Sequence, residues 1–209
     1  MISGPAHRGA AFTDAANGDM RRDPDACRSV SSSLGISPEW ATVRQVHGSR
    51  VLERRTPGPL GEADAIWTTR RGLPLAVLTA DCLGVVLHAE NAVGVAHAGW
   101  RGTASGVVTA LREAMISGGA SPHAASIGPG IGPCCFEVGA DVANLFPDQV
   151  SETSWGTVSV DLVSAVRQQL HGLEVWSAGH CTRHHDGMFS HRRDRTESRM
   201  ATIGWIHEL

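Results

Sequence analysis

Residues 80–102 read Ala-Asp-Cys-Leu-Gly-Val-Val-Leu-His-Ala-Glu-Asn-Ala-Val-Gly-Val-Ala-His-Ala-Gly-Trp-Arg-Gly. Two apolar runs, Val85–Leu87 and Val93–Ala96, flank a short polar turn, which predicts a β-hairpin. In such a hairpin the start of the first strand lies beside the end of the second. We therefore expect Cys82 and His97 to be neighbours.

The residues that follow His97 suggest why this pair matters. After Ala-Gly-Trp-Arg-Gly a helical pattern begins, so His97 is predicted at a strand-to-helix turn, where catalytic side chains are often presented. A thiol beside an imidazole suits either a metal ion or a nucleophile–base pair. The alternative is that the pair binds no metal and has no catalytic role, and that Cys82 is a buried structural cysteine next to a histidine in a turn.

Length and charge narrow the classes of protein to consider. A chain of 209 residues can bury a real core as a single domain, residues 1–209. The net charge of −3 does not indicate a positively charged surface that would bind polyanions, so we expect no nucleic-acid partner. All 18 basic residues are arginine, which excludes a Schiff-base lysine and the lysine of a Walker-type phosphate loop.

The five cysteines form no regular framework, and their number is odd. No stretch has the pattern of a secretory signal or reaches membrane-spanning length. We therefore expect a cytoplasmic protein with reduced thiols and no membrane partner. A monomer is compatible with the sequence, which leaves the oligomeric state open.

Strand patterns outnumber helical ones and do not alternate strictly with them, which favours an α+β fold with mixed sheets. We interpret Arg50–Arg55 as a hairpin partner of the strand at Ala41–Val46, and residues 57–59 as a loop. The other predicted strands are Gly9–Thr13, Ala63–Thr69, Leu75–Thr79, Ala124–Ile127, Leu173–Ala178 and Met200–Ile206. Helices are predicted at Asp23–Leu34, at Thr103–Ser117 and after Asp161 as N-cap.

A third candidate ligand is His47, which ends a predicted strand and is followed by a glycine. Together with Cys82 and His97 it would give two imidazoles and one thiolate, with a fourth position open for water. That pattern is typical of catalytic zinc. The spacings are not those of a structural zinc finger, so the sequence alone only suggests the site.

The segment 180–191 is a second candidate for a metal site, because it holds four histidines and one cysteine. Five arginines lie in or beside it and argue for an anion such as phosphate rather than a cation: Arg183, Arg192, Arg193, Arg195 and Arg199. A solvated polar loop is equally compatible. We interpret the adjacent Cys134 and Cys135 as small buried residues beside a glycine turn.

Five motifs resemble one known family: Gln45–Gly48, Thr79–Cys82, His97–Gly102, Gly128–Cys135 and Phe189–Asp194. This family was first described as multicopper polyphenol oxidases, or laccases, and is now regarded as purine nucleoside phosphorylases with adenosine deaminase activity. The resemblance covers roughly residues 41–206. It implies a four-layer α/β/β/α sandwich and a zinc ion on His47, Cys82 and His97.

The resemblance also implies a reaction. It would be zinc-dependent phosphorolysis of adenosine, inosine, guanosine or methylthioadenosine to the free base and ribose 1-phosphate, with deamination of adenosine besides. Candidates for holding inorganic phosphate are Arg101 and either Arg192 or Arg193. Asp81 could shuttle the proton in deamination, although orienting its turn is an equally good role.

Three alternatives stay open at this point. The first is a copper-dependent polyphenol oxidase, although four-electron reduction of oxygen needs several coppers and more ligands than we find. The second is a metal-free amidohydrolase in which His97 activates Cys82. The third is a zinc-stabilised binding module, which an open coordination position argues against.

Overall fold

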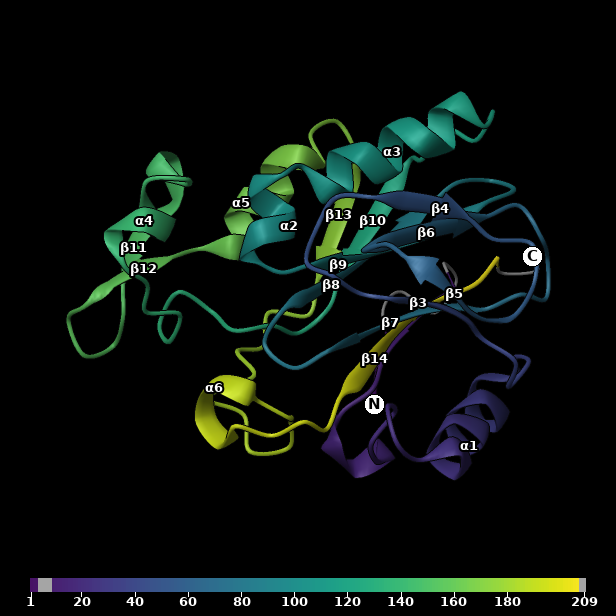
Figure 1. Cartoon of the computed structure of the whole chain (residues 1–209), viewed down its shortest axis with the longest axis horizontal. Helices are drawn as coiled ribbons and strands as arrows, with labels where there is room; N and C mark the ends of the chain where they lie inside the picture. Colours follow the sequence, from purple (N-terminus) through teal and green to yellow (C-terminus); the bar gives the residue numbers. More distant parts are fainter. Residues whose placement is uncertain (4–8, 207–209) are drawn as a thin grey trace.

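Two six-stranded sheets form the centre of the molecule (Figure 1), in a computed structural model that describes residues 1–3 and 9–206. Sheet A contains, in spatial order, β1 (Ile2–Ser3), β2 (Ala10–Phe12), β14 (Met200–Gly204), β7 (Leu75–Thr79), β3 (Ala41–Arg44) and β5 (Gly58–Glu62). Sheet B contains β13 (Glu174–Ser177), β10 (Ala124–Ile127), β8 (Leu83–His88), β9 (Val93–Ala98), β6 (Ala65–Thr68) and β4 (Val51–Glu53). Both sheets mix parallel and antiparallel pairs, as predicted.

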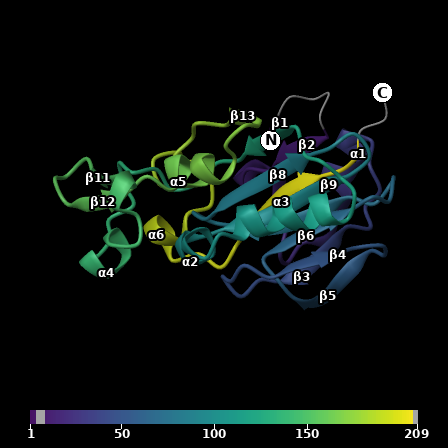
Figure 2. The ribbon, with the colours of Figure 1, turned by 90° about the horizontal axis from the view of Figure 1, so that it is seen from above.

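Helices cover the outer faces of the two sheets, so the predicted α/β/β/α sandwich is confirmed (Figures 1 and 2). Sheet B carries α2 (Trp100–Ala104), α3 (Val107–Ser117) and α5 (Leu162–Gln169), and sheet A carries α1 (Pro24–Leu34). An arm extends away from the sandwich and contains α4 (Ala140–Ala143), β11 (Val150–Glu152) and β12 (Val158–Val160). The remaining short helices are η2 (Ala15–Asn17), η3 (Pro147–Gln149) and α6 (His191–Asp194).

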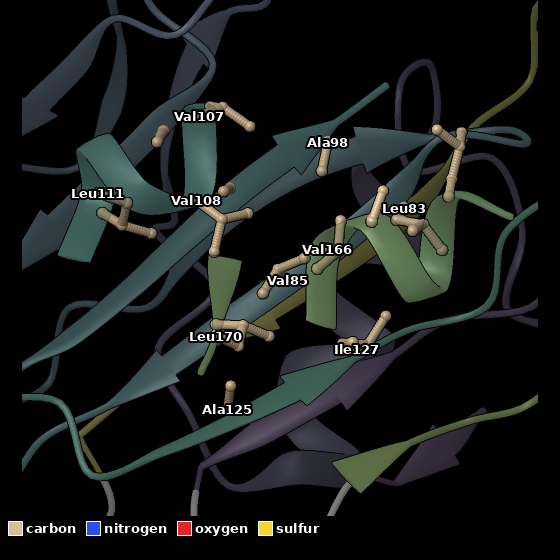
Figure 3. Packing of buried hydrophobic residues seen from close by; sticks show 14 of the residues in the cluster. Leu83, Val85, Ala98, Val107, Val108, Leu111, Ala125, Ile127, Val166 and Leu170 are labelled. Atoms are coloured by element: carbon tan, nitrogen blue, oxygen red, sulfur yellow. The ribbon is translucent and has the colours of Figure 1, made fainter. Parts of the chain in front are cut away.

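Three apolar layers hold the sandwich together. Between sheet B and its helices, Val85 packs with Leu111 and Val166 (Figure 3). Val86, the next residue of β8, points the other way, into the layer between the sheets. Successive side chains of a strand face opposite sides, so a strand covered on both faces must be apolar throughout. This is why the central hairpin reads as unbroken apolar runs.

The ends of the predicted helices are set by the residues that the sequence indicated. The carboxylate of Asp23 accepts hydrogen bonds from two backbone N–H groups at the start of α1. The carboxylate of Asp161 caps α5 by accepting from the backbone N–H of Ser164. The helix predicted at Thr103–Ser117 is instead two helices. It breaks at Gly106, whose backbone is left-handed (φ 74°), a conformation that interrupts a right-handed helix.

Two predictions about the first strands are wrong. The segment at Arg50–Arg55 forms β4, but it pairs in parallel with β6 of sheet B rather than with β3. Residues 57–59 are not simply a loop, because Gly58 begins β5, the edge strand of sheet A beside β3. A proline cannot donate to a ladder but is tolerated at an edge, and this explains why a Gly-Pro stretch can still be a strand.

The central hairpin is confirmed, with Gly84 of β8 opposite His97 of β9. The chain passes from sheet A to sheet B through the turn at residues 80–82, between β7 and β8. His47 follows β3 of sheet A, and His97 lies near the end of β9 of sheet B. The candidate site therefore lies where the ends of the two sheets meet.

Candidate metal centre

The structure brings His47, Cys82 and His97 together. One ligand atom from each lies within 4.8 Å of the others. The two imidazole rings meet edge to face, with their centroids 4.8 Å apart. Zinc bonds of roughly 2.0–2.3 Å place tetrahedral ligand atoms about 3.3–3.8 Å apart, so small side-chain rotations would close the set on one ion.

The three side chains differ in their access to solvent. His97 is only 3% exposed, Cys82 is half-buried and His47 is exposed. The cluster therefore runs from the interior to the surface, and its open side is next to His47. Two imidazoles and one thiolate with an open side are the donor set of a catalytic zinc site.

Unusual backbone conformations place two of these residues. His47 and Asp81 have left-handed φ angles of 61° and 84°. Few residues other than glycine adopt this conformation, and it costs of order 1–3 kcal/mol where it is imposed. The turn at Asp81 aims the next residue, Cys82, at His97, and the turn at His47 aims its own ring at the same point.

Two glycines of the His97–Gly102 motif are required by close approach. A Cβ atom on Gly99 would lie 2.9 Å from Sγ of Cys82 and 3.3 Å from the His47 ring. A Cβ on Gly102 would lie 3.0 Å from the carbonyl oxygen of Gly48. Both positions border the cluster, and a side chain at either would push the candidate ligands apart.

Asp64, which sequence reasoning missed, organises the cluster from behind. It is fully buried at the start of β6, and its Oδ1 accepts hydrogen bonds from Nδ1 of His97 (2.8 Å) and from the backbone N–H of His47 (2.9 Å). Oδ2 accepts from the N–H groups of Val46 and Gly48. Because Nδ1 of His97 donates to a carboxylate, Nε2 is left to act as ligand, a common arrangement in metal sites.

Cys82, His97 and Asp64 shift one another's pKa values toward their charged forms. Burial raises the pKa of the Cys82 thiol, but hydrogen bonds with His47 and His97 outweigh it and lower this pKa to about 6. Burial lowers the pKa of His97, whereas its bonds to Asp64 and Cys82 raise it to about 9. Burial also raises the pKa of Asp64, but His97 and the backbone N–H groups of Gly48 and Val46 bring it below its usual value. Without metal, the cluster is therefore a thiolate–imidazolium–carboxylate chain near neutral pH.

Asp81 connects this cluster to the segment 180–194. Its Oδ1 accepts a hydrogen bond from the Thr182 hydroxyl and its Oδ2 from the backbone N–H of Arg192, both at 2.6 Å. Asp81 is 9% exposed. Both carboxylate oxygens are engaged in holding the segment against the turn that carries Cys82.

The three candidate phosphate ligands have different surroundings. Arg101 is exposed at the start of α2, with its guanidinium 4.1 Å from the centroid of the Trp100 ring. Arg192 is exposed in α6 and donates to the carbonyl oxygen of Glu137 (2.9 Å). The guanidinium of Arg193 instead donates to Asp194 and to four backbone carbonyls of residues 182–188.

A second group of candidate ligands lies in the same part of the fold. Cys134, Cys135, Cys181 and His184 each offer a ligand atom, and these atoms lie within 4.8 Å of one another. We call these four residues the cysteine cluster. Only Cys135 is fully buried, so the interpretation of both adjacent cysteines as buried packing residues holds for one of them.

Comparisons with known proteins identify the family. The chain matches the model of the multi-copper polyphenol oxidoreductase laccase family over residues 13–207. The chain belongs to this family. The resemblance predicted from five motifs is thus confirmed, and the match begins well before residue 41.

Several proteins similar to this chain are named for another activity. A protein named purine nucleoside phosphorylase ORF3 from Streptomyces griseus is 42% identical over 191 residues, covering 83% of this chain and 77% of that protein. Purine nucleoside phosphorylase YfiH from Escherichia coli is 34% identical over 85% of this chain and 77% of its own length. The crystal structure of YlmD from Geobacillus stearothermophilus has a TM-score of 0.84 at 29% identity, covering 98% and 94% of the two chains.

One further observation concerns membranes. Among the helices of the described residues, none combines the length and the apolar character needed to cross a bilayer.

Proposed function

We propose that the protein is a zinc-dependent purine nucleoside phosphorylase. The observation that carries this proposal is the cluster of His47, Cys82 and His97, with Asp64 fixing the ring of His97. Relatives that are 34–42% identical and are named purine nucleoside phosphorylase support the choice of substrate. The reaction would take a purine nucleoside and inorganic phosphate to the free base and ribose 1-phosphate.

The three proposed ligands fit zinc by their chemistry and by the room around them. His47, Cys82 and His97 would hold the ion, and Gly99 leaves space beside the sulfur. When bound, zinc supplies a Lewis-acidic position and lowers the pKa of a bound water to near neutrality. The exposed side at His47 gives substrate a route to this position. A reducing cytoplasm, which we propose as the location, would keep the thiol available for metal.

We propose that Arg101 and Arg192 hold phosphate, because both side chains are exposed and the backbone of each is linked to the cluster. Arg101 lies four positions after His97, and the backbone of Arg192 is bound to Asp81 next to Cys82. Arginine matches phosphate geometry with paired donors. Arg193 is committed to carbonyl groups, and Asp81 accepts two hydrogen bonds, so we assign both to positioning the segment 180–194.

Adenosine deamination is proposed as a second activity of the same site. Zinc-loaded protein incubated with adenosine and phosphate should yield adenine and ribose 1-phosphate, together with inosine and ammonia. Omitting phosphate should abolish adenine formation and leave inosine formation intact. These products are separated by chromatography, with zinc measured on the same sample.

Two outcomes would overturn the proposal. One is zinc-loaded protein that forms neither adenine nor inosine. The other is copper-loaded protein that oxidises a phenol and consumes oxygen while the zinc form is inert, which would favour the activity in the family's description.

A metal-free amidohydrolase is the second candidate, and the charge state of the cluster favours it. Cys82 with a pKa of about 6, His97 and Asp64 have the order of a nucleophile, a base and an orienting carboxylate. This candidate predicts that chelator-treated protein hydrolyses an amide such as glutamine. The zinc proposal predicts that the same treatment abolishes all activity and that added zinc restores it.

A further inference from the structure

The cysteine cluster unites two segments that are distant in sequence. Cys134 and Cys135 belong to the glycine-rich segment after β10, whereas Cys181 and His184 belong to the segment after β13. Sγ of Cys134 lies 3.6 Å from Nδ1 of His184, although 50 positions separate these residues. Three sulfur atoms and one imidazole thus share a space no wider than 4.8 Å.

Backbone contacts hold these two segments together without help from the sulfur atoms. Gly130 and Cys181 form an isolated parallel bridge, in which the N–H of Thr182 donates to the Gly130 carbonyl (3.0 Å). The N–H of Ser154, from the arm, donates to the carbonyl of Cys134 (2.9 Å). The four side chains are therefore presented by ordered backbone, as a preformed binding site requires.

Gly132 adds a contact that favours charged sulfur. Its N–H donates to Sγ of Cys181 at 3.2 Å. Backbone donors that point at sulfur stabilise a thiolate, which is the form that binds metal. A Cβ on Gly132 would lie 3.4 Å from both Cys134 Sγ and Cys181 Cβ, so the backbone of Gly132 borders the sulfur atoms directly.

We propose that Cys134, Cys135, Cys181 and His184 form a second zinc site with a structural role. Three thiolates and one imidazole complete a tetrahedron, and closed sites of this composition are typical of structural zinc. A disulfide would use only two of the three sulfur atoms and would leave a thiol and an imidazole unused. No residue is common to this cluster and to the group of His47, Cys82 and His97.

The arginines of the segment do not oppose this site. We predicted from sequence that they would repel a cation, but Arg193 is bound to backbone carbonyls and Arg183 lies over the Trp155 ring (4.5 Å). A zinc ion with three thiolates also carries a net negative charge, which nearby guanidinium groups would stabilise rather than repel.

A metal here would act on the first site through Thr182. This residue follows Cys181 directly. Its hydroxyl group donates a hydrogen bond to the carboxylate of Asp81, the neighbour of Cys82. Fixing Cys181 therefore fixes Thr182, and with it the contact between the segment 180–194 and the turn at residues 81–82.

Zinc content per chain tests the proposal with the full-length protein. Zinc-loaded wild-type protein should hold two ions after gel filtration, and Cys82→Ser should hold one. His184→Ala should also hold one, and because His184 is exposed this variant should keep the fold. Cys27→Ser, on α1, is the matched control and should hold two.

Pulse alkylation of wild-type protein gives a second measurement that needs no variant. Zinc should protect the two half-buried thiols, Cys134 and Cys181, and a chelator should make both reactive together, as mass spectrometry of each cysteine would show. Cobalt-loaded Cys82→Ser should in addition show thiolate-to-metal charge-transfer absorption. The proposal is overturned if zinc-loaded Cys82→Ser holds no zinc, if His184→Ala retains a second zinc, or if freshly isolated protein contains a Cys134–Cys181 disulfide.

Discussion

Cys82 is the residue at which the candidate functions differ most. As a zinc ligand it must be a thiolate, and serine is a poor replacement because its hydroxyl does not ionise near neutral pH. We expect Cys82→Ser to lose the first zinc, the activity and thermal stability together, as measured by metal analysis, product formation and calorimetry. Loss of activity with unchanged zinc and unchanged melting temperature would instead favour a nucleophile. Cys27→Ser is the control.

The acidity of Cys82 gives a prediction about pH in metal-free protein. Its pKa is lowered to about 6, so the reactive thiolate is present above that pH and is lost as the pH falls through it. The rate of alkylation of Cys82 should therefore be half-maximal near pH 6 and level off above it, whereas an ordinary thiol reaches half of its maximal rate only near pH 8.5. Zinc should suppress the reaction throughout. Equal rates with and without zinc would exclude Cys82 as a ligand.

The variant Asp64→Asn tests whether the hydrogen-bond partner of the ligand His97 contributes to zinc affinity. Each of its oxygens accepts two hydrogen bonds, so Asp64→Asn places an amide N–H₂ against two N–H donors whichever way the amide turns. We expect zinc affinity to fall roughly 10–100-fold, as for other partners of ligating histidines. Competition with a chromogenic chelator measures this. Glu53→Gln, on the exposed edge strand β4, should have no effect.

At the scale of elements, α6 is the short helix that would bring phosphate to the metal. Its N–H at Arg192 is bound to Asp81, and the side chain of the same residue is exposed. Arg192→Ala should raise the phosphate concentration needed for half-maximal rate about tenfold or more, because a charged hydrogen bond is worth about 1.5–3 kcal/mol. Zinc content should stay unchanged.

A matched variant for this test is Arg28→Ala, since Arg28 is an exposed arginine on α1 whose partner is Asp25 of the same helix. It should leave the phosphate dependence as it is. If Arg192→Ala loses zinc and keeps its phosphate dependence, the segment binds metal rather than substrate.

Local patterns predicted the elements well where the chemistry is local. The hairpin of β8 and β9, the caps at Asp23 and Asp161 and most strands follow from short stretches of sequence. Pairing between sheets does not, and β4 was therefore given the wrong partner. The same limit applies to the site. His47, Cys82 and His97 were found from strand ends, but the cysteine cluster depends on two segments whose meeting no local pattern encodes.

The sequence around Asp64 does contain a feature that points to its role. It is an acidic residue at the start of the apolar strand pattern of residues 63–69, where a buried carboxylate needs several donors to be tolerated. The identity of those donors, on the loop at residues 46–48, depends on the tertiary structure.

At the scale of the whole molecule, the proposed zinc joins the two sheets. His47 follows a strand of sheet A, and His97 belongs to sheet B. Removing zinc should increase hydrogen exchange in residues 45–50 and 80–82, because these loops lose a common anchor, while β8 and β9 stay protected by the core. Exchange followed by mass spectrometry measures this. Unchanged exchange in both loops on chelation would contradict a metal bridge between the sheets.

The order of sheet A has a consequence for biosynthesis. β14 lies between β2 and β7, so a strand made after almost two hundred residues occupies a central place beside two of the earlier ones. While the ribosome is still producing the chain, β2 and β7 each lack a neighbour, and such open edges invite pairing with other chains. The proposed metal ligands His47, Cys82 and His97 are therefore all synthesised well before sheet A is complete. Sheet A has all of its strands only after β14 has been made.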